Sequence, residues 1–295
     1  GLVGTVQGIA FIATSVFSGL SVGLLGMGPT MVIATVFVAV PIVHLYFLRI
    51  PEPEIVHDPE RSAIDFKGGM AAMLAVPGLF ALVLFTMLNN LSGGVFMALL
   101  DPYGLNMFPV EIWGLVFGLA STGFIVGGII VAKWGLGKNP IRTMLILVAL
   151  LGVLGMFFTI REWPWLFIGG IWLFMAMMPA IEAAEQTVIQ RVVPFEKQGR
   201  VFGLAMTFEA AAAPITSLLI APIAEFWVVP YMSEAEGEAQ WSWLLGEGES
   251  RGIALIFLIS GFLMILLAIG ASLTRSYRLL SRSWMDAAPP VDSAS

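Results

Sequence analysis

The chain has 295 residues, of which 58% are hydrophobic and 12% charged, with a mean hydropathy of +0.93 and a net charge of −6. A soluble domain carries about 25% charged residues, so this composition excludes a soluble enzyme, a disordered chain and a nucleic-acid binder. Cysteine is absent, which excludes disulfides and thiolate metal sites. The composition indicates an all-α polytopic membrane protein.

The first two predicted spans lie in residues 1–48, which contain no Asp, Glu, Lys or Arg. A span needs about 20 apolar residues, so this stretch holds two helices and is too long for a signal peptide. The Gly- and Pro-containing break at 26–29 gives helices near 3–24 and 29–48. Residues 49–67 are rich in charge and are expected to lie in water.

Six further spans follow from stretches with little or no charge. They are expected at 68–100, 112–132, 143–160, 163–190, 201–226 and 252–274. The whole chain is therefore predicted to form about eight transmembrane helices. Small-xxx-small pairs on the 112–132 span, Gly114 with Gly118 and Gly123 with Gly127, predict close packing against other helices.

The basic residues indicate the topology. If segment 49–67 lies in the cytoplasm, all but two of the 14 Lys and Arg side chains lie there too, and Arg161 and Arg251 are left on the other side. This bias agrees with the positive-inside rule and predicts that both termini are cytoplasmic. The acidic, Trp-bearing segment 227–249 is then expected to be a solvated loop on the opposite face.

Three segments resemble a known family. Residues 193–203 read VPFEKQGRVFG and resemble the VPxxxQGRVFG signature of the drug-proton antiporter branch of the major facilitator superfamily, which includes macrolide and siderophore exporters. Residues 48–53 resemble the end of helix six of that family. Residues 128–135 resemble its second cytoplasmic gating motif, with Ala132 where an acidic residue is usual. The resemblance covers nearly the whole chain and corresponds to helices five to twelve of twelve.

The resemblance implies an organisation and a set of gate residues. Residues 1–48 would be the last two helices of the amino-terminal half, 49–69 the cytoplasmic central linker, 70–283 the six-helix carboxyl-terminal half and 284–295 a disordered cytoplasmic tail. Helices one to four have no counterpart, so we expect the carboxyl-terminal two-thirds of a longer transporter or a truncated product. The cytoplasmic gate candidates are Lys133, Gly135, Gln198, Gly199 and Arg200.

Three carboxylates interrupt the predicted spans. An ionisable group in a span costs about 3 kcal/mol on insertion scales, so such groups usually face a cavity or a partner. Glu182 and Glu185 are three residues apart and share one helix face, and Glu209 lies at a similar depth on the next helix. Carboxylates that face one another in a dry cavity can bind and release a proton near neutral pH. The alternative is that they only hydrogen-bond neighbouring helices or stabilise a vestibule.

Together these features predict a secondary active transporter of the plasma (inner) membrane, driving proton-coupled efflux of amphipathic small molecules such as drugs, macrolides or siderophores. Asn89 and Asn90 are candidates for contacting polar substrate groups, with interhelical hydrogen bonding as the alternative. The expected partners are the substrate, protons and the lipid bilayer, with no nucleic acid, cofactor or metal, and the protein is expected to be monomeric.

Two other functions compete with transport. One is a truncated, non-transporting membrane fragment. The other is a membrane-embedded enzyme, which is less favoured because the sequence has no HExxH or GxSxG motif and no cysteine. No catalytic residue is therefore proposed.

Overall fold

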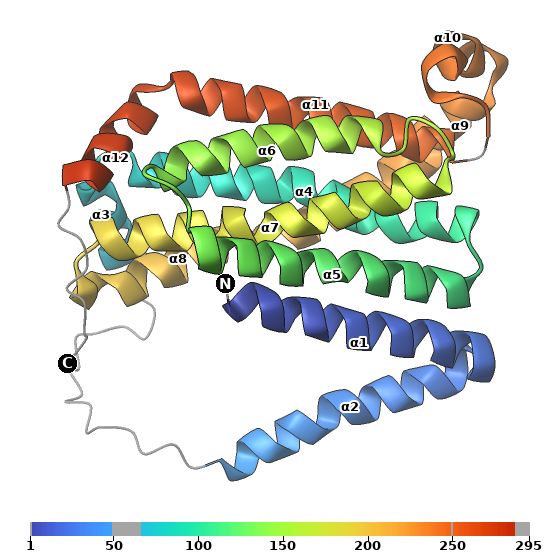
Figure 1. Ribbon diagram of the computed structural model, residues 1–295, viewed down its shortest axis with the longest axis horizontal. Coiled ribbons are helices and arrows are strands. Elements are labelled where there is room, and N and C mark those ends of the chain that lie inside the picture. Colours follow the sequence, from blue (N-terminus) through green and yellow to red (C-terminus); the bar gives the residue numbers. More distant parts are fainter. Residues whose placement is uncertain (1, 49–65, 249, 287–295) are drawn as a thin grey trace.

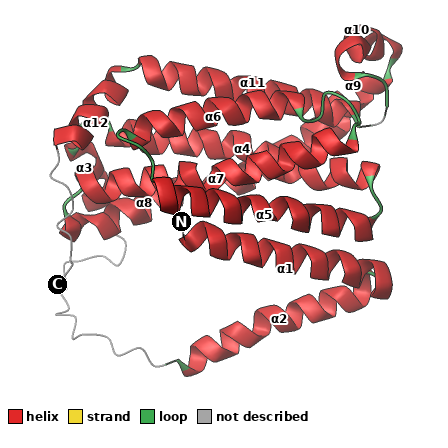
Figure 2. Cartoon of the chain, in the orientation of Figure 1, coloured by secondary structure: helices red, strands yellow, loops and turns green. Residues whose placement is uncertain are grey.

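The computed structural model describes residues 2–48, 66–248 and 250–286, and within these ranges all regular structure is helical (Figure 1) (Figure 2). Eight helical segments in this part of the chain are long and apolar enough to cross a membrane. Their helices are α1 (Leu2–Leu25), α2 (Met27–Phe47), α4 (Leu79–Met107), α5 (Val110–Trp134), α6 (Pro140–Phe157), α7 (Pro164–Val192), α8 (Phe195–Ile223) and α11 (Arg251–Leu273). The prediction of an all-α protein with about eight spans is confirmed.

Glycine and proline set two of the helix boundaries. The break between α1 and α2 is at Gly26, whose φ of 82° is accessible mainly to glycine. The span predicted at 68–100 is instead divided into α3 (Phe66–Ala75) and α4, which runs on to Met107. Pro77 and Gly78, with a φ of 87°, stand at the division. The prediction of one continuous span across 68–100 is therefore wrong, because the left-handed Gly78 beside Pro77 separates α3 from α4.

The segment predicted as a loop at 227–249 is mostly helical. Pro222 removes one backbone hydrogen bond near the end of α8, and the helix then widens into the π-helical segment η1 (Ala224–Val228). Two short helices follow, α9 (Val229–Ser233) and α10 (Ala235–Leu245). Glu236 and Glu238 lie in the first turn of α10, where the helix dipole favours acidic side chains.

The spans form a curved row in which neighbours in space are often distant in sequence (Figure 1). Helix α5 packs between α1 and α7, α6 between α7 and α11, and α4 between α11 and α8. Helix α2 lies at the edge of the row beside α1 (Figure 1). This order leaves α1, α4, α7 and α8 around one interior space.

The predicted glycine pairs of α5 contact two different helices. A Cβ atom on Gly114 would lie 2.8 Å from the Cα of Gly19 on α1, and one on Gly118 would meet Val16. Gly123 and Gly127 in turn abut the backbone of α7. The expectation that these pairs allow close helix packing is confirmed.

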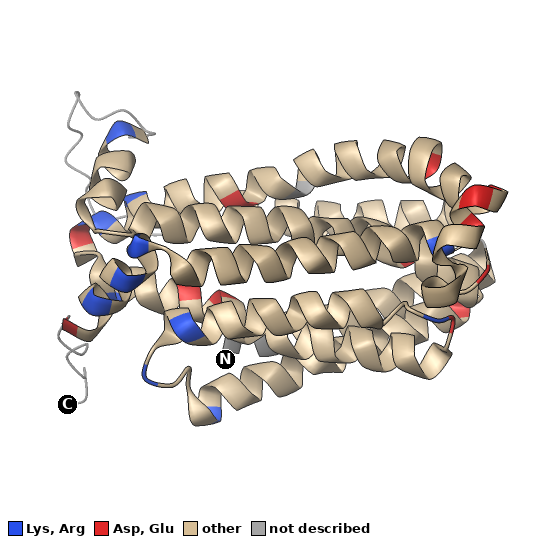
Figure 3. Ribbon diagram, turned by 90° about the horizontal axis from the view of Figure 1, so that it is seen from above, with Lys and Arg blue, Asp and Glu red and all other residues tan. Residues whose placement is uncertain are grey.

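Basic side chains gather at one end of the bundle, which is called the basic end below (Figure 3). There the amphipathic helix α12 (Arg275–Asp286) follows α11 and buries Leu280, Ser281 and Trp284. The Trp284 Nε1 donates a hydrogen bond of 3.1 Å to the Lys138 carbonyl, and the Arg191 guanidinium lies 4.2 Å from the centre of the indole ring. Helix α12 therefore fixes the ends of α6 and α7. It continues to Asp286, and the rest of the predicted tail lies outside the described residues.

Candidate functional site

The three carboxylates predicted to bind protons or substrate lie close together in the folded bundle. Glu182 and Glu185 lie one turn apart on α7, and Glu209 comes from α8. The Glu185 side chain is 8% exposed, and Thr86 Oγ1 on α4 donates a hydrogen bond of 2.9 Å to its Oε1 atom. Glu209 lies beside the same interior space as Glu182 and Glu185.

These groups line a cavity of about 560 Å³ between α1, α4, α7 and α8. Its lining comprises Gln7, Thr86, Asn89, Asn90, Met178, Ile181, Glu182, Glu185, Gln186, Ile189, Phe202, Ala205, Met206 and Glu209. We call this space the polar chamber. All five predicted substrate or proton residues line it, although nothing in the sequence placed the two asparagines beside the carboxylates.

A second hollow of about 250 Å³ adjoins the first and shares Asn90, Met178 and Glu209 with it. Its other lining residues are mostly apolar, namely Phe11, Gly93, Gly94, Met97, Phe124, Phe174 and Met175. We call this space the apolar chamber. It lies further from the basic end along α4 and α7, because Met97 and Phe174 are more distant than Asn89 and Glu185 from the helix ends at Leu79 and Val192. The site is therefore polar near the basic end and apolar deeper in the bundle.

Several lining residues were not predicted from the sequence. Gln7 is the only amide side chain in residues 1–48, and that isolated polar group was a usable signal. Thr86 gave no such signal, because a threonine hydroxyl in a span commonly bonds a backbone carbonyl of its own helix. Gln186 directly follows Glu185, and its neutral amide is a weaker signal in a span than the neighbouring carboxylates.

The chemistry of the site does not indicate a resident metal. Among the described residues, no group of three or more His, Asp or Glu side chains is arranged to hold an ion. The amide and carboxyl groups instead alternate with Met and Phe around a space large enough for a small organic molecule. The arrangement can bind a ligand that has both a polar and an apolar part, and it can hold a proton.

The predicted gate residues occupy two turns at the basic end. Lys133 lies in the last turn of α5 with Nζ 4.9 Å from the centre of the Trp134 ring, and Gly135 ends that helix with a φ of 67°. Gln198 Nε2 donates hydrogen bonds to the carbonyls of Gln190 at 2.7 Å and Val193 at 3.0 Å. Gln198 thus caps the carboxyl end of α7, next to the carboxylate-bearing turns.

The other two residues of that motif have different surroundings. A Cβ atom on Gly199 would meet nothing within 4 Å. The Arg200 side chain is exposed, while its carbonyl oxygen lies beside Gly69 of α3. The structure therefore assigns a local structural role to Gln198 and leaves the gating role of Gly199 and Arg200 as a prediction.

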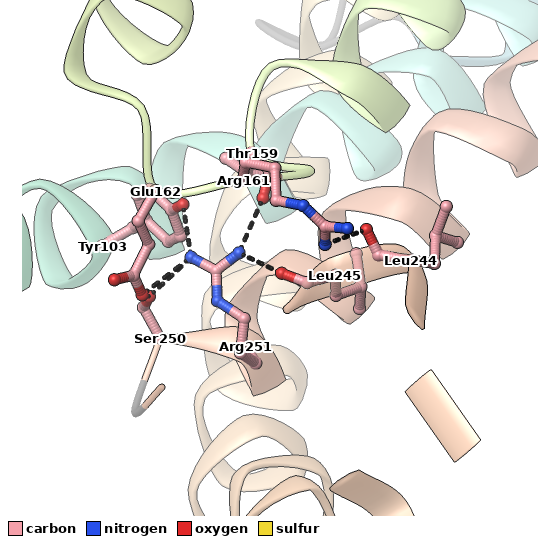
Figure 4. A network of polar contacts seen from close by, with 8 residues as sticks. All are labelled: Tyr103, Thr159, Arg161, Glu162, Leu244, Leu245, Ser250 and Arg251. Carbon is pink, nitrogen blue, oxygen red and sulfur yellow. Dashed lines mark hydrogen bonds and ion pairs between the residues drawn. The ribbon is translucent and has the colours of Figure 1, made fainter. Parts of the chain in front are cut away.

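The opposite end of the bundle holds a polar network that the sequence did not predict (Figure 4). Arg251, expected on the outer side, is 1% exposed, and its guanidinium bonds the Thr159 and Leu245 carbonyls at 3.1 and 2.8 Å. It also bonds the Tyr103 hydroxyl at 2.9 Å and Glu162 Oε1 at 2.8 Å. This one side chain links α4, the α6–α7 turn, α10 and the start of α11.

The neighbouring Arg161 adds a second link to α10, with bonds of 2.5 Å to the Leu244 carbonyl and 3.1 Å to the Trp243 carbonyl (Figure 4). The network lies at the end of the spans away from the carboxylates and lines neither chamber. Its partners lie far apart in the sequence, which is why composition alone left Arg161 and Arg251 as two unassigned charges.

Comparisons with known proteins agree with this architecture. The model of the Major Facilitator Superfamily matches residues 1–217. A crystal structure of a bacterial homolog of the human lysosomal transporter Spinster, inward-facing and unoccupied, is similar in fold, with a TM-score of 0.52 and 14% identity over 97% of this chain and 67% of that one. No curated protein matches the sequence. The family model covers well over half of the chain, which therefore belongs to the major facilitator superfamily.

Proposed function

We propose that this chain, a transporter by family and not an enzyme, carries amphipathic small molecules across the plasma membrane in exchange for protons. The observation that carries the proposal is the meeting of Glu182, Glu185 and Glu209 in a cavity that is polar on one side and apolar on the other. In this family, transport proceeds by alternating access to a site between helix bundles.

The location of Glu185 and Glu209 on the wall of one cavity supports proton coupling. Two carboxyl groups that share one proton can exchange it when a cationic group takes its place, because the incoming charge stabilises both carboxylates. Glu209 lines both chambers, so a substrate in the apolar chamber and a proton in the polar chamber would compete for the same carboxylate. That competition is what an antiporter requires.

The basic end is proposed to face the cytoplasm, since basic loops are retained on that side. The polar chamber lies nearer this end, so substrate would enter with its polar part towards the cytoplasm. The working unit is proposed to be a monomer, because both chambers are lined by helices of one chain.

Reconstituted vesicles test the proposal. With an imposed pH gradient, the wild-type chain is expected to accumulate 1-naphthylmethylguanidinium, an amphipathic cation that stays protonated, against its concentration gradient. Glu209→Gln, Glu185→Gln and Glu182→Gln are each expected to abolish most of this accumulation. The matched control is Glu196→Gln, which makes the same change on an exposed residue of α8 and should retain it. Accumulation at the wild-type level by all three cavity variants would refute the assignment.

A further inference from the structure

The polar chamber contains buried hydrogen-bond acceptors that have no partner. The Oδ1 atom of Asn89 and the Oε1 atom of Gln7 are both buried without a hydrogen bond. The Asn89 side chain is only 5% exposed, yet it lines the chamber. Buried polar atoms in folded proteins are nearly always satisfied, so an unpaired acceptor that lines a cavity indicates a ligand that donates to it.

The charge of the chamber specifies that ligand further. Three carboxyl groups line it, and among the described residues no Lys, Arg or His does so in either chamber. The Thr86 hydroxyl, which could otherwise donate to a ligand, is engaged by Glu185. A ligand that neutralises the carboxylates and also satisfies Asn89 and Gln7 must carry positive charge and several hydrogen-bond donors, and a primary or secondary ammonium or a guanidinium supplies both from one group.

The lining of the apolar chamber indicates the rest of the ligand. Phe11 and Phe124 on its wall are stacked, with ring centres 5.5 Å apart, and Met97 and Met175 complete an adaptable surface. Glu209 and Asn90 stand where the two chambers meet. A ligand that spans both spaces would place its charge among the carboxylates and an aromatic or aliphatic body against these rings.

We infer that the substrate is a primary or secondary ammonium or a guanidinium with an apolar body, and that Asn89 and Gln7 select for its N–H groups. This inference rests on the proposed function for the identity of the substrate site and adds the chemical class and orientation of the cargo. It separates such amines from quaternary ammonium ions, which carry the charge without the donors, and from anionic amphiphiles.

Binding of three matched probes to the purified full chain in neutral detergent tests the inference without any gradient. The probes are 1-naphthylmethylammonium, its N,N,N-trimethyl analogue and 1-naphthylacetate, followed by calorimetry. The ammonium is expected to bind about tenfold or more tightly than the trimethyl analogue, because the latter leaves buried acceptors unpaired. The acetate is expected not to compete.

Variants locate the two ends of the ligand. Asn89→Leu and, independently, Gln7→Leu should reduce the preference for the ammonium over its trimethyl analogue. Phe11→Ala should weaken both cations by a similar factor and keep their ratio. Asn106→Leu, on an exposed residue of the same helix as Asn89, should change nothing. Gel filtration and the unfolding midpoint establish that each variant is folded, and Gln7→Leu carries the test if Asn89→Leu is not.

Equal affinity for the two cations in the wild-type chain, tighter binding of the acetate, or binding of none of the probes would overturn the inference. So would an unchanged preference in the folded acceptor variants. The proposed function fails separately. If the chain selects the ammonium but shows no proton-driven transport, the substrate class is supported and proton coupling is contradicted. If the chain transports with a pH gradient but prefers the acetate, proton coupling is supported and the substrate class is contradicted.

Discussion

Thr86 on α4 donates a hydrogen bond to Glu185 on α7, across the interior of the bundle and between residues 99 apart in the sequence. Both side chains are buried, at 3% and 8% exposure. Because Glu209 on α8 lines the same cavity, residues of three helices meet around this carboxyl group. The geometry of the candidate proton site therefore depends on a hydroxyl group that carries no charge.

Replacing that hydroxyl tests how firmly the carboxyl is held. Thr86→Val keeps the shape and removes the donor, and hydrogen bonds between membrane helices are worth on average about 0.6 and at most about 1.7 kcal/mol. We expect the free energy of unfolding in mixed micelles to fall by about that amount. Thr86→Ser keeps the hydroxyl donor and should retain most of the wild-type free energy of unfolding. A Thr86→Val/Glu185→Leu double-mutant cycle with no coupling energy would contradict the contact, since each single substitution removes one partner of the bond.

The buried Arg251 predicts a larger effect at the other end of the bundle. Arg251→Met leaves two backbone carbonyls, Tyr103 and Glu162 without their shared donor (Figure 4). We expect the free energy of unfolding to fall by at least about 2 kcal/mol, since each hydrogen bond to a charged group contributes about 1.5–3 kcal/mol. Arg251→Lys should retain only part of that free energy of unfolding, because an ammonium cannot reproduce the forked hydrogen-bond geometry of a guanidinium.

Arg161→Met is the control for that prediction. Arg161 is less buried and bonds only two carbonyls of α10. Arg161→Met should therefore lower the free energy of unfolding clearly less than Arg251→Met does. Thermal unfolding of both variants measures the difference. Equal destabilisation by the two substitutions would show that Arg251 does not have the bracing role that its contacts imply.

The amide of Gln198 predicts an effect confined to the end of α7. Gln198→Glu removes two hydrogen bonds to α7 carbonyls and adds negative charge at the negative end of the helix dipole. The expected cost is about 1 kcal/mol or more. Gln190→Glu places the same charge on an exposed residue of the same turn without losing a side-chain bond. Hydrogen exchange over the last turn of α7 should accelerate in the first variant and much less in the second.

The contact between α1 and α5 depends on two facing glycines. Gly114→Ala would place a methyl group 2.8 Å from the Cα of Gly19 and from the Ser15 carbonyl oxygen, which forces the helices apart. Overpacking of this kind costs about 1–3 kcal/mol. Gly169→Ala on α7 meets nothing within 4 Å and should be neutral or stabilising, because alanine is the better helix former. A neutral Gly114→Ala would disprove the close packing.

The eight spans were predictable because each is an apolar stretch long enough to cross the bilayer, and that signal is local. The division at Pro77 and Gly78 was missed because proline alone is compatible with a kink, and only the positive φ of Gly78 distinguishes a break. The helical course of the segment after Pro222 was also missed, since short polar helices resemble loops in composition.

The candidate site was only partly predictable. Helical spacing placed Glu182 and Glu185 on one face, but the approach of Glu209, Asn89 and Gln7 depends on how α8, α4 and α1 pack around α7. The burial of Arg251 could not be inferred for the same reason. Its partners come from three other segments that only the folded bundle brings together.

The most direct test of the central claim, that the carboxyl pair couples proton movement to amphiphile movement, measures the protons themselves. Vesicles containing the chain and a trapped pH-sensitive dye are given an outward gradient of 1-naphthylmethylguanidinium. The wild-type chain is expected to acidify the interior as the guanidinium leaves, and a Glu185→Gln/Glu209→Gln variant is expected to produce no pH change. Efflux of the guanidinium by the wild-type chain with no change in internal pH, or wild-type acidification by the double variant, would contradict the account.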